Sequence, residues 1–195
     1  MKEFNPDLLI PLQGELKARI FQNESLGIPP TLFWDIEIPL KPFSLEGKTV
    51  NTTIILNFIR IPVSSITELS GKDFVFPVNP EEGYIDGSVY IRNAHHPVDI
   101  TKLFFGEIEN GKIPVSFSYD VLFEYERSGY ANLFSVELST ELSLTELQID
   151  YEILEDLEYN VEKVTEVVAN HFNLTELGSV IQEEEDIYFR FNTKV

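Results

Sequence analysis

The segment Ile108-Glu109-Asn110-Gly111-Lys112-Ile113 constrains the fold more than any other part of this chain. An Asn-Gly pair favours the left-handed backbone of a two-residue hairpin turn, and strand-like runs lie on both sides of it. Pairing Glu109 with Lys112 predicts a register in which Phe104 lies opposite Phe117. The sequence therefore predicts an antiparallel hairpin that turns at residues 110 and 111.

The run after this turn alternates between apolar and polar residues, which is the pattern of a half-buried strand. Its apolar positions are Val115, Phe117, Tyr119, Val121, Phe123 and Tyr125. A second two-residue turn, at Ser128-Gly129, predicts a third strand with Val121 opposite Val136. In that register Asp120 lies opposite Glu137, which is a mildly repulsive pair.

These three strands form a meander, at 102–109, 112–126 and 130–144. Shorter alternating runs precede the meander, at 15–20, 34–38, 51–58 and 88–92. Breaks that contain proline or glycine separate these runs. Such a series predicts a mainly β (α+β) fold, with an antiparallel sheet or sandwich built on the 102–144 meander.

The apolar pattern changes phase after Leu144, since alternate residues from Leu147 to Ile153 are apolar where the preceding pattern requires polar ones. This change predicts a bulge around Thr145-Glu146 within a continuing strand. We therefore divide the chain into an antiparallel β domain at 1–145 and a strand-helix-hairpin element at 146–195 that packs on it.

One helix is expected within this C-terminal element. Val161, Val164, Val168 and Phe172 recur at helical spacing, and Asn160 is suited to cap the helix N-terminus. Residues 177–191 then predict a closing hairpin, with an acidic turn at 183–186.

The charge of the chain is strongly negative and unevenly distributed. Thirty-three acidic and fourteen basic residues give a net charge of −19, and residues 141–195 alone carry fourteen acids and three bases, a net of −11. Such a field repels nucleic acid phosphates and anionic membranes and attracts basic proteins. The sequence therefore predicts no nucleic acid partner and no membrane partner.

The chain contains no cysteine, which excludes disulfides and thiolate chemistry. It shows neither a secretion signal nor an apolar stretch long enough to span a bilayer. We expect a cytoplasmic protein.

Two adjacent histidines, His95 and His96, are followed by Pro97 and Asp99. A zinc site needs three or four ligands, and the remaining histidine, His171, lies on the expected helix. Adjacent residues of a strand point to opposite faces, and a proline favours an extended or turn conformation before it. We therefore predict a polar turn here, with His95, His96 and Asp99 as weak candidate metal ligands.

No established catalytic motif occurs in the sequence, which lacks both a glycine-rich phosphate loop and a Gly-x-Ser-x-Gly element. Asp35 and Glu37 have the spacing of carboxylates that could flank a glycosidic bond, but a solvated strand face already explains the pair, and nothing beyond the spacing marks it as catalytic. We predict that the protein is not an enzyme and holds no cofactor. A metal-dependent hydrolase that uses the two histidines and Asp99 is the third-ranked alternative.

Acidic residues of the C-terminal region are the candidate binding site. They are Glu155, Asp156, Glu158, Glu162, Glu166, Glu183, Glu184, Glu185 and Asp186. Their self-repulsion costs folding free energy, which a basic partner would offset, whereas helix-terminus and turn preferences are the alternative explanation. Tyr159 and Tyr188 are candidate apolar anchors within this set.

A small, acidic, cysteine-free chain without a catalytic signature resembles, in composition, bacterial immunity and inhibitor proteins that neutralise basic toxins. The resemblance implies a basic protein partner, namely a cognate toxin. The alternative is an acidic structural or accessory interaction domain with no inhibitory role.

Overall fold

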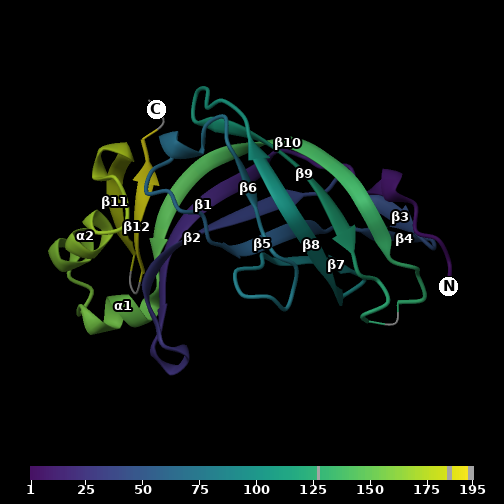
Figure 1. Cartoon of the computed structure of the whole chain (residues 1–195), viewed down its shortest axis with the longest axis horizontal. Helices are drawn as coiled ribbons and strands as arrows, with labels where there is room; N and C mark the ends of the chain where they lie inside the picture. Colours follow the sequence, from purple (N-terminus) through teal and green to yellow (C-terminus); the bar gives the residue numbers. More distant parts are fainter. Residues whose placement is uncertain (127, 184–185, 193–195) are drawn as a thin grey trace.

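One ten-stranded sheet organises the computed structural model, which describes residues 1–126, 128–183 and 186–192 (Figure 1). Its strands are β1 (Gly14–Asn23), β2 (Ile28–Pro39), β5 (Thr53–Ile59), β6 (Asp73–Val75), β7 (Asp86–Ile91), β8 (Ala94–Phe105), β9 (Lys112–Val121), β10 (Leu133–Ile149), β11 (Leu177–Glu183) and β12 (Asp186–Phe191). They pair in the order β1-β2-β5-β7-β8-β9-β10-β12-β11, and β6 pairs with β8 beside this path. The predicted mainly β, antiparallel fold is confirmed.

The other elements are short. A two-stranded sheet consists of β3 (Phe43–Leu45) and β4 (Lys48–Val50), and the two α-helices are α1 (Tyr151–Asp156) and α2 (Val161–Ala169). Single 3-10 turns are η1 (Pro6–Leu8), η2 (Glu24–Leu26), η3 (Thr67–Leu69) and η4 (Leu174–Glu176). None of the helices in the described ranges has the length and apolarity needed to cross a membrane.

The large sheet closes on itself because β10 has two sets of partners. Its first part pairs with β9 and its second part pairs in parallel with β1, which also pairs with β2. Seven strands therefore form a closed ring of pairings. Figure 1 shows β10 curving over the length of the molecule, with β12 and β11 continuing the sheet at one end.

Alternation along the strands places one side chain in two in the core. The largest fully buried side chains include Trp34, Tyr119, Phe105, Phe123, Leu16, Ile20 and Ile36. The Trp34 ring lies 6.0 Å from that of Phe172, which follows α2 in the chain. The C-terminal helix therefore packs against the core of the sheet.

The hairpin between β8 and β9 forms where the Asn-Gly pair predicts it. Glu109 bridges to Lys112, and Asn110 and Gly111 both have left-handed backbones. Leu103 lies opposite Phe117, so the predicted pairing of Phe104 with Phe117 is wrong by one residue. Glu109 pairs with Lys112 as predicted, but Phe105 already pairs with Val115. The one-residue shift therefore arises between the turn and Phe105.

The predicted pairing of Val121 with Val136 is also wrong. Val121 pairs with Leu133, and Tyr119 pairs with Val136. Strand β9 ends at Val121, and a longer connection replaces the expected two-residue turn. Ser135 then adopts a left-handed backbone (φ 56°), and its N–H donates to Asp120 Oδ1 at 2.7 Å, which makes a bulge in β10.

From Val136 to Ser143 the register lies two residues from the predicted one, so the side chains of this part that were predicted to share a face still do so. Asp120 lies opposite Asp99 of β8, while Ser118 lies opposite Glu137, so the expected pair of Asp120 with Glu137 does not form.

The C-terminal element follows the prediction except at its start. The expected bulge at Thr145-Glu146 is confirmed, since Leu16 pairs with Leu144 and Ala18 with Leu147. Strand β10 nevertheless ends at Ile149, and residues 151–156 form α1, so the expected strand over 147–153 is too long. Asp150 begins this helix because its carboxylate accepts the Glu152 N–H at 3.1 Å.

The later part of this element is as expected. Helix α2 has Asn160 as its N-cap, with Asn160 Oδ1 accepting the N–H groups of Glu162 and Lys163. Strands β11 and β12 form the closing hairpin, and β12 also pairs with β10.

Candidate protein-binding surface

Two helices and a hairpin bring the acidic residues of the C-terminal region to one end of the molecule. Gln182 Nε2, near the end of β11, donates to the Tyr159 carbonyl between α1 and α2 at 3.3 Å. The end of the hairpin that carries Glu183 and Asp186 therefore lies beside the helices, as Figure 1 shows. We call this region the acidic end.

Most of the candidate carboxylates at the acidic end are exposed. The exposed ones are Glu155, Asp156, Glu158, Glu162, Glu166, Glu183 and Asp186, whereas Glu184 and Glu185 lie outside the described residues. Few cations balance them: Lys163 lies 3.8 Å from Glu158, and Arg190 is engaged by Glu146 at 2.7 Å. The acidic end thus combines high negative charge with little internal neutralisation.

Two acidic residues of this region have structural roles. Asp156 Oδ2 accepts from Gln22 Nε2 at 2.9 Å, which ties α1 to β1. The Glu176 carboxylate is buried and accepts the N–H of Ile66, the N–H of Thr67 at 3.3 Å and the Thr67 hydroxyl. Glu176 therefore fastens the loop before η3 to the C-terminal element.

Neither tyrosine that we expected as an anchor presents a fully exposed ring. Tyr159 is half-buried against the core. The Tyr188 hydroxyl donates to Glu183 at 3.3 Å, and the Arg190 guanidinium lies 5.1 Å from its ring centre. The aromatic ring that is most open at the acidic end is Tyr151, on α1, with 59% of its surface exposed. Its alternation with Ile149 and Ile153 concealed it in the sequence.

The predicted polar turn at the two histidines is wrong, because both lie on β8. The chain reverses earlier, at Arg92 and Asn93, which have left-handed backbones. His96 is buried, packs edge-on against Phe123 at 4.9 Å, and has no hydrogen-bond partner for Nδ1 among the described residues. Burial lowers the pKa of His96, so its imidazole is neutral at pH 7. It is a core residue.

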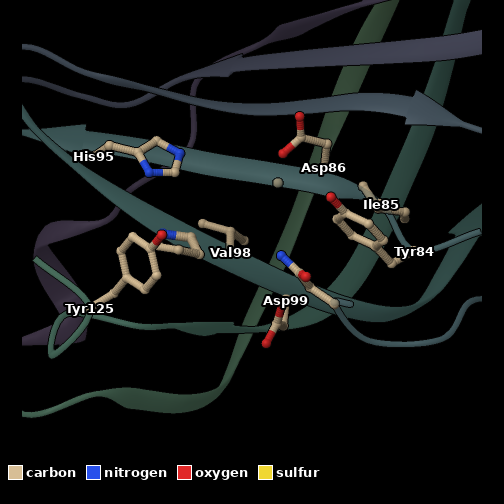
Figure 2. A pocket seen from close by; sticks show the side chains of 10 residues that line it. Tyr84, Ile85, Asp86, His95, Val98, Asp99 and Tyr125 are labelled. Atoms are coloured by element: carbon tan, nitrogen blue, oxygen red, sulfur yellow. The ribbon is translucent and has the colours of Figure 1, made fainter. Parts of the chain in front are cut away.

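His95 points the other way, into a small surface cavity of about 100 Å³ (Figure 2). Asp86, Tyr84 and Tyr125 also line the cavity, together with Asp99. In Figure 2 the Asp99 carboxylate points away from His95. Small-molecule sites usually occupy about 300 Å³ or more, so this cavity is too small for one.

The three weak metal candidates do not meet at one point. His95 and His96 lie on opposite faces of β8, and no group of three or more metal-ligating side chains occurs in the described ranges. Burial raises the pKa of Asp99, and the negative charge of Asp120, which lies opposite Asp99 on β9, raises it further.

Asp35 and Glu37 do share one face of β2, but Asp35 is not solvated as we expected. Only 3% of Asp35 is exposed; its carboxylate accepts the Phe58 N–H at 3.0 Å and lies 2.9 Å from an Arg19 Nη atom. Glu37 pairs with Lys17 at 3.1 Å. Burial raises the pKa of Asp35, and the Arg19 charge opposes that rise. Each carboxylate is held in an ion pair between β1 and β2, which is a structural arrangement.

Glu46 is a further structural carboxylate that the sequence did not reveal. It accepts from Lys2, Arg92 and Tyr130, which come from three distant parts of the chain. These hydrogen bonds lower its pKa to about 2.

Comparisons of the chain with protein-family models, with curated proteins and with solved structures found no match.

Proposed function

We propose that the protein is a non-enzymatic binding protein whose acidic end receives a basic protein partner, with a toxin that it inhibits as the favoured partner class. The observation that supports this most is the fold-back of the β11–β12 hairpin onto the α1–α2 connection. This fold-back gathers carboxylates from α1, α2 and the hairpin at one end of the molecule. Among the described residues from 141 to 192, the only lysine or arginine side chains that could balance them are Lys163 and Arg190.

Such an arrangement suits recognition of a basic surface. Like charges held together repel one another, and a cationic partner relieves that repulsion when it binds. The field also accelerates encounter, by roughly ten- to a thousandfold at low ionic strength. Because the sequence lacks cysteine, we place the encounter in the reducing cytoplasm.

An accessory domain without inhibitory activity is the second candidate. Asp156 and Glu176 favour it, because both use their charge to hold the C-terminal element in place. The two candidates differ in whether binding changes the activity of the partner.

Co-expression with the basic products of neighbouring genes tests the proposal. We expect a stable complex whose affinity falls steeply with salt and which suppresses the activity of the partner. The quadruple variant Glu155→Lys, Glu162→Lys, Glu183→Lys and Asp186→Lys should lose at least a hundredfold in affinity.

A charge-matched control separates the acidic end from overall charge. The changes Glu81→Lys, Glu82→Lys, Glu109→Lys and Glu137→Lys alter the net charge equally, but these exposed residues lie in the β6–β7 loop, the β8–β9 turn and the part of β10 that pairs with β9. The control should keep its affinity within about threefold at physiological salt, where distant charges are screened. Equal losses in both variants would contradict the assignment to the acidic end, and a complex that leaves the partner active would favour the accessory domain.

A further inference from the structure

Strand β11 ends the path of paired strands, so within the described part of the chain one of its edges has no strand partner. It pairs with β12, and no other strand of the described ranges pairs with it. Figure 1 shows it on the far side of β12 from β10. Gly178, Ser179, Val180, Gln182 and Glu183 are all exposed.

Backbone groups along this edge can accept an added strand. Alternate residues of a paired strand direct their N–H and C=O groups away from the partner. Counting from the Glu183–Asp186 pair that closes the hairpin, we expect Val180 and Gln182 to point away from β12. The regular pairing covers residues 180–183, because the register is irregular between Leu177 and Val180.

The edge also lacks the sequence features that usually protect one. Proteins block open edges with proline, lysine or a covering element. The sequence of β11, Leu-Gly-Ser-Val-Ile-Gln-Glu, contains no proline and no lysine, and its one charge is Glu183. Val180 keeps 39% of its surface exposed on this strand. An extended segment would find both a hydrogen-bonding edge and an apolar side chain there.

The negative charge of the acidic end favours a basic segment, rather than a second copy of this chain, as the strand that pairs with the β11 edge. A second copy of this chain would bring Glu183 and a net charge of −19 against the same charges. A segment with lysine or arginine at alternate positions would instead face the carboxylates of the acidic end.

We propose that β11 binds an extended basic segment of the partner as an added antiparallel or parallel strand, with backbone pairing along residues 180–183. This inference rests on the proposed function and specifies how the partner binds at the acidic end.

Blocked synthetic peptides with four valine-lysine repeats provide the test, with fluorescence anisotropy in about 50 mM salt, where exposed charges are weakly screened. We expect the peptide to bind and its affinity to fall steeply with salt. Methylating the backbone nitrogens of alternate residues preserves its charge but removes N–H donors, and it should weaken binding at least tenfold. The valine-glutamate peptide of equal length should not bind.

A protein variant provides the complementary measurement. Val180→Pro removes an N–H that faces solvent, a position at which an edge strand tolerates proline. Its fold is checked by circular dichroism, and the folded variant should bind the valine-lysine peptide at least tenfold more weakly. Sedimentation should find the wild-type protein monomeric.

The outcomes separate the two proposals. If the methylated peptide or folded Val180→Pro binds within twofold of its parent, the strand-addition inference is wrong while an electrostatic site at the acidic end stands. If the valine-glutamate peptide binds equally well, the edge is used but the basic partner and the proposed function are wrong. Absence of binding by every cationic peptide contradicts the inference, and a dimer that Val180→Pro dissociates assigns the edge to a second copy.

Discussion

Replacing Glu176 with glutamine should weaken the attachment of the C-terminal element to the loop before η3. The carboxylate is 5% exposed and accepts from two backbone N–H groups and one hydroxyl, at positions up to 110 residues away in sequence. A glutamine keeps one carbonyl oxygen but turns an NH₂ group toward the remaining donors. Losing a hydrogen bond to a charged group costs about 1.5–3 kcal/mol, and leaving a buried N–H unsatisfied costs about 1–3 kcal/mol.

We expect Glu176→Gln to lower the free energy of unfolding by about 3 kcal/mol, which for a chain of this size is a fall of roughly 6–12 °C in melting temperature. Urea unfolding followed by the fluorescence of Trp34, the single tryptophan, measures this directly. The matched control Glu166→Gln changes an exposed carboxylate on α2 and should stay within about 0.5 kcal/mol of wild type. If Glu176→Gln also stays within that range, Glu176 does not fasten the C-terminal element.

Three further changes test other parts of the structure. Because the pKa of Glu46 is lowered to about 2 from 4.5, the stabilisation that its charge provides is complete above pH 4.5 and is lost as the pH falls toward 2. The difference in melting temperature between wild type and Glu46→Gln should therefore shrink over that interval. A constant difference would contradict the assigned contacts. Gly87→Ala would place a Cβ 2.1 Å from the Val98 carbonyl oxygen and should cost about 3 kcal/mol, whereas Gly178→Ala, whose nearest contact is 3.4 Å, should be tolerated; similar melting temperatures for the two would refute the close approach. Asn160→Ala should cost about 1 kcal/mol in urea unfolding and Asn160→Asp almost nothing, and equal losses would show that the cap of α2 does not act through its side-chain oxygen.

Local patterns in the sequence predicted most of the strands, because each pattern has a local physical cause. The Asn-Gly turn, the alternation of β9 and the bulge after Leu144 all depend on neighbouring residues. The β9–β10 register error arose because a longer connection, between Val121 and Leu133, replaces the expected two-residue turn. The bulge at Ser135, whose N–H donates to the Asp120 carboxylate on the next strand, then shifts the pairing by one residue, and no local pattern encodes that contact.

The candidate site was less accessible to sequence reasoning because long-range contacts define it. Concentrated charge indicated the C-terminal region, but the convergence of hairpin and helices depends on the contact between Gln182 and Tyr159. The alternation around Asp35 indicated a solvated strand face, and no sequence pattern marks Glu176, yet both are buried by partners on other elements. The helical turn at Tyr151 was missed because two alternating apolar residues fit a strand and a short helix equally well.

The association rate of the protein with the partner recovered by co-expression tests the central assignment most directly. Stopped-flow measurements between low and high salt should show the wild-type rate constant falling by at least tenfold, as expected for electrostatic steering. The quadruple lysine variant (at Glu155, Glu162, Glu183 and Asp186) should associate slowly at low salt, and its rate constant should respond little to added salt. The charge-matched control variant should behave like wild type. A wild-type rate that does not change with salt, or a lysine variant that is indistinguishable from wild type, would contradict a basic partner at the acidic end.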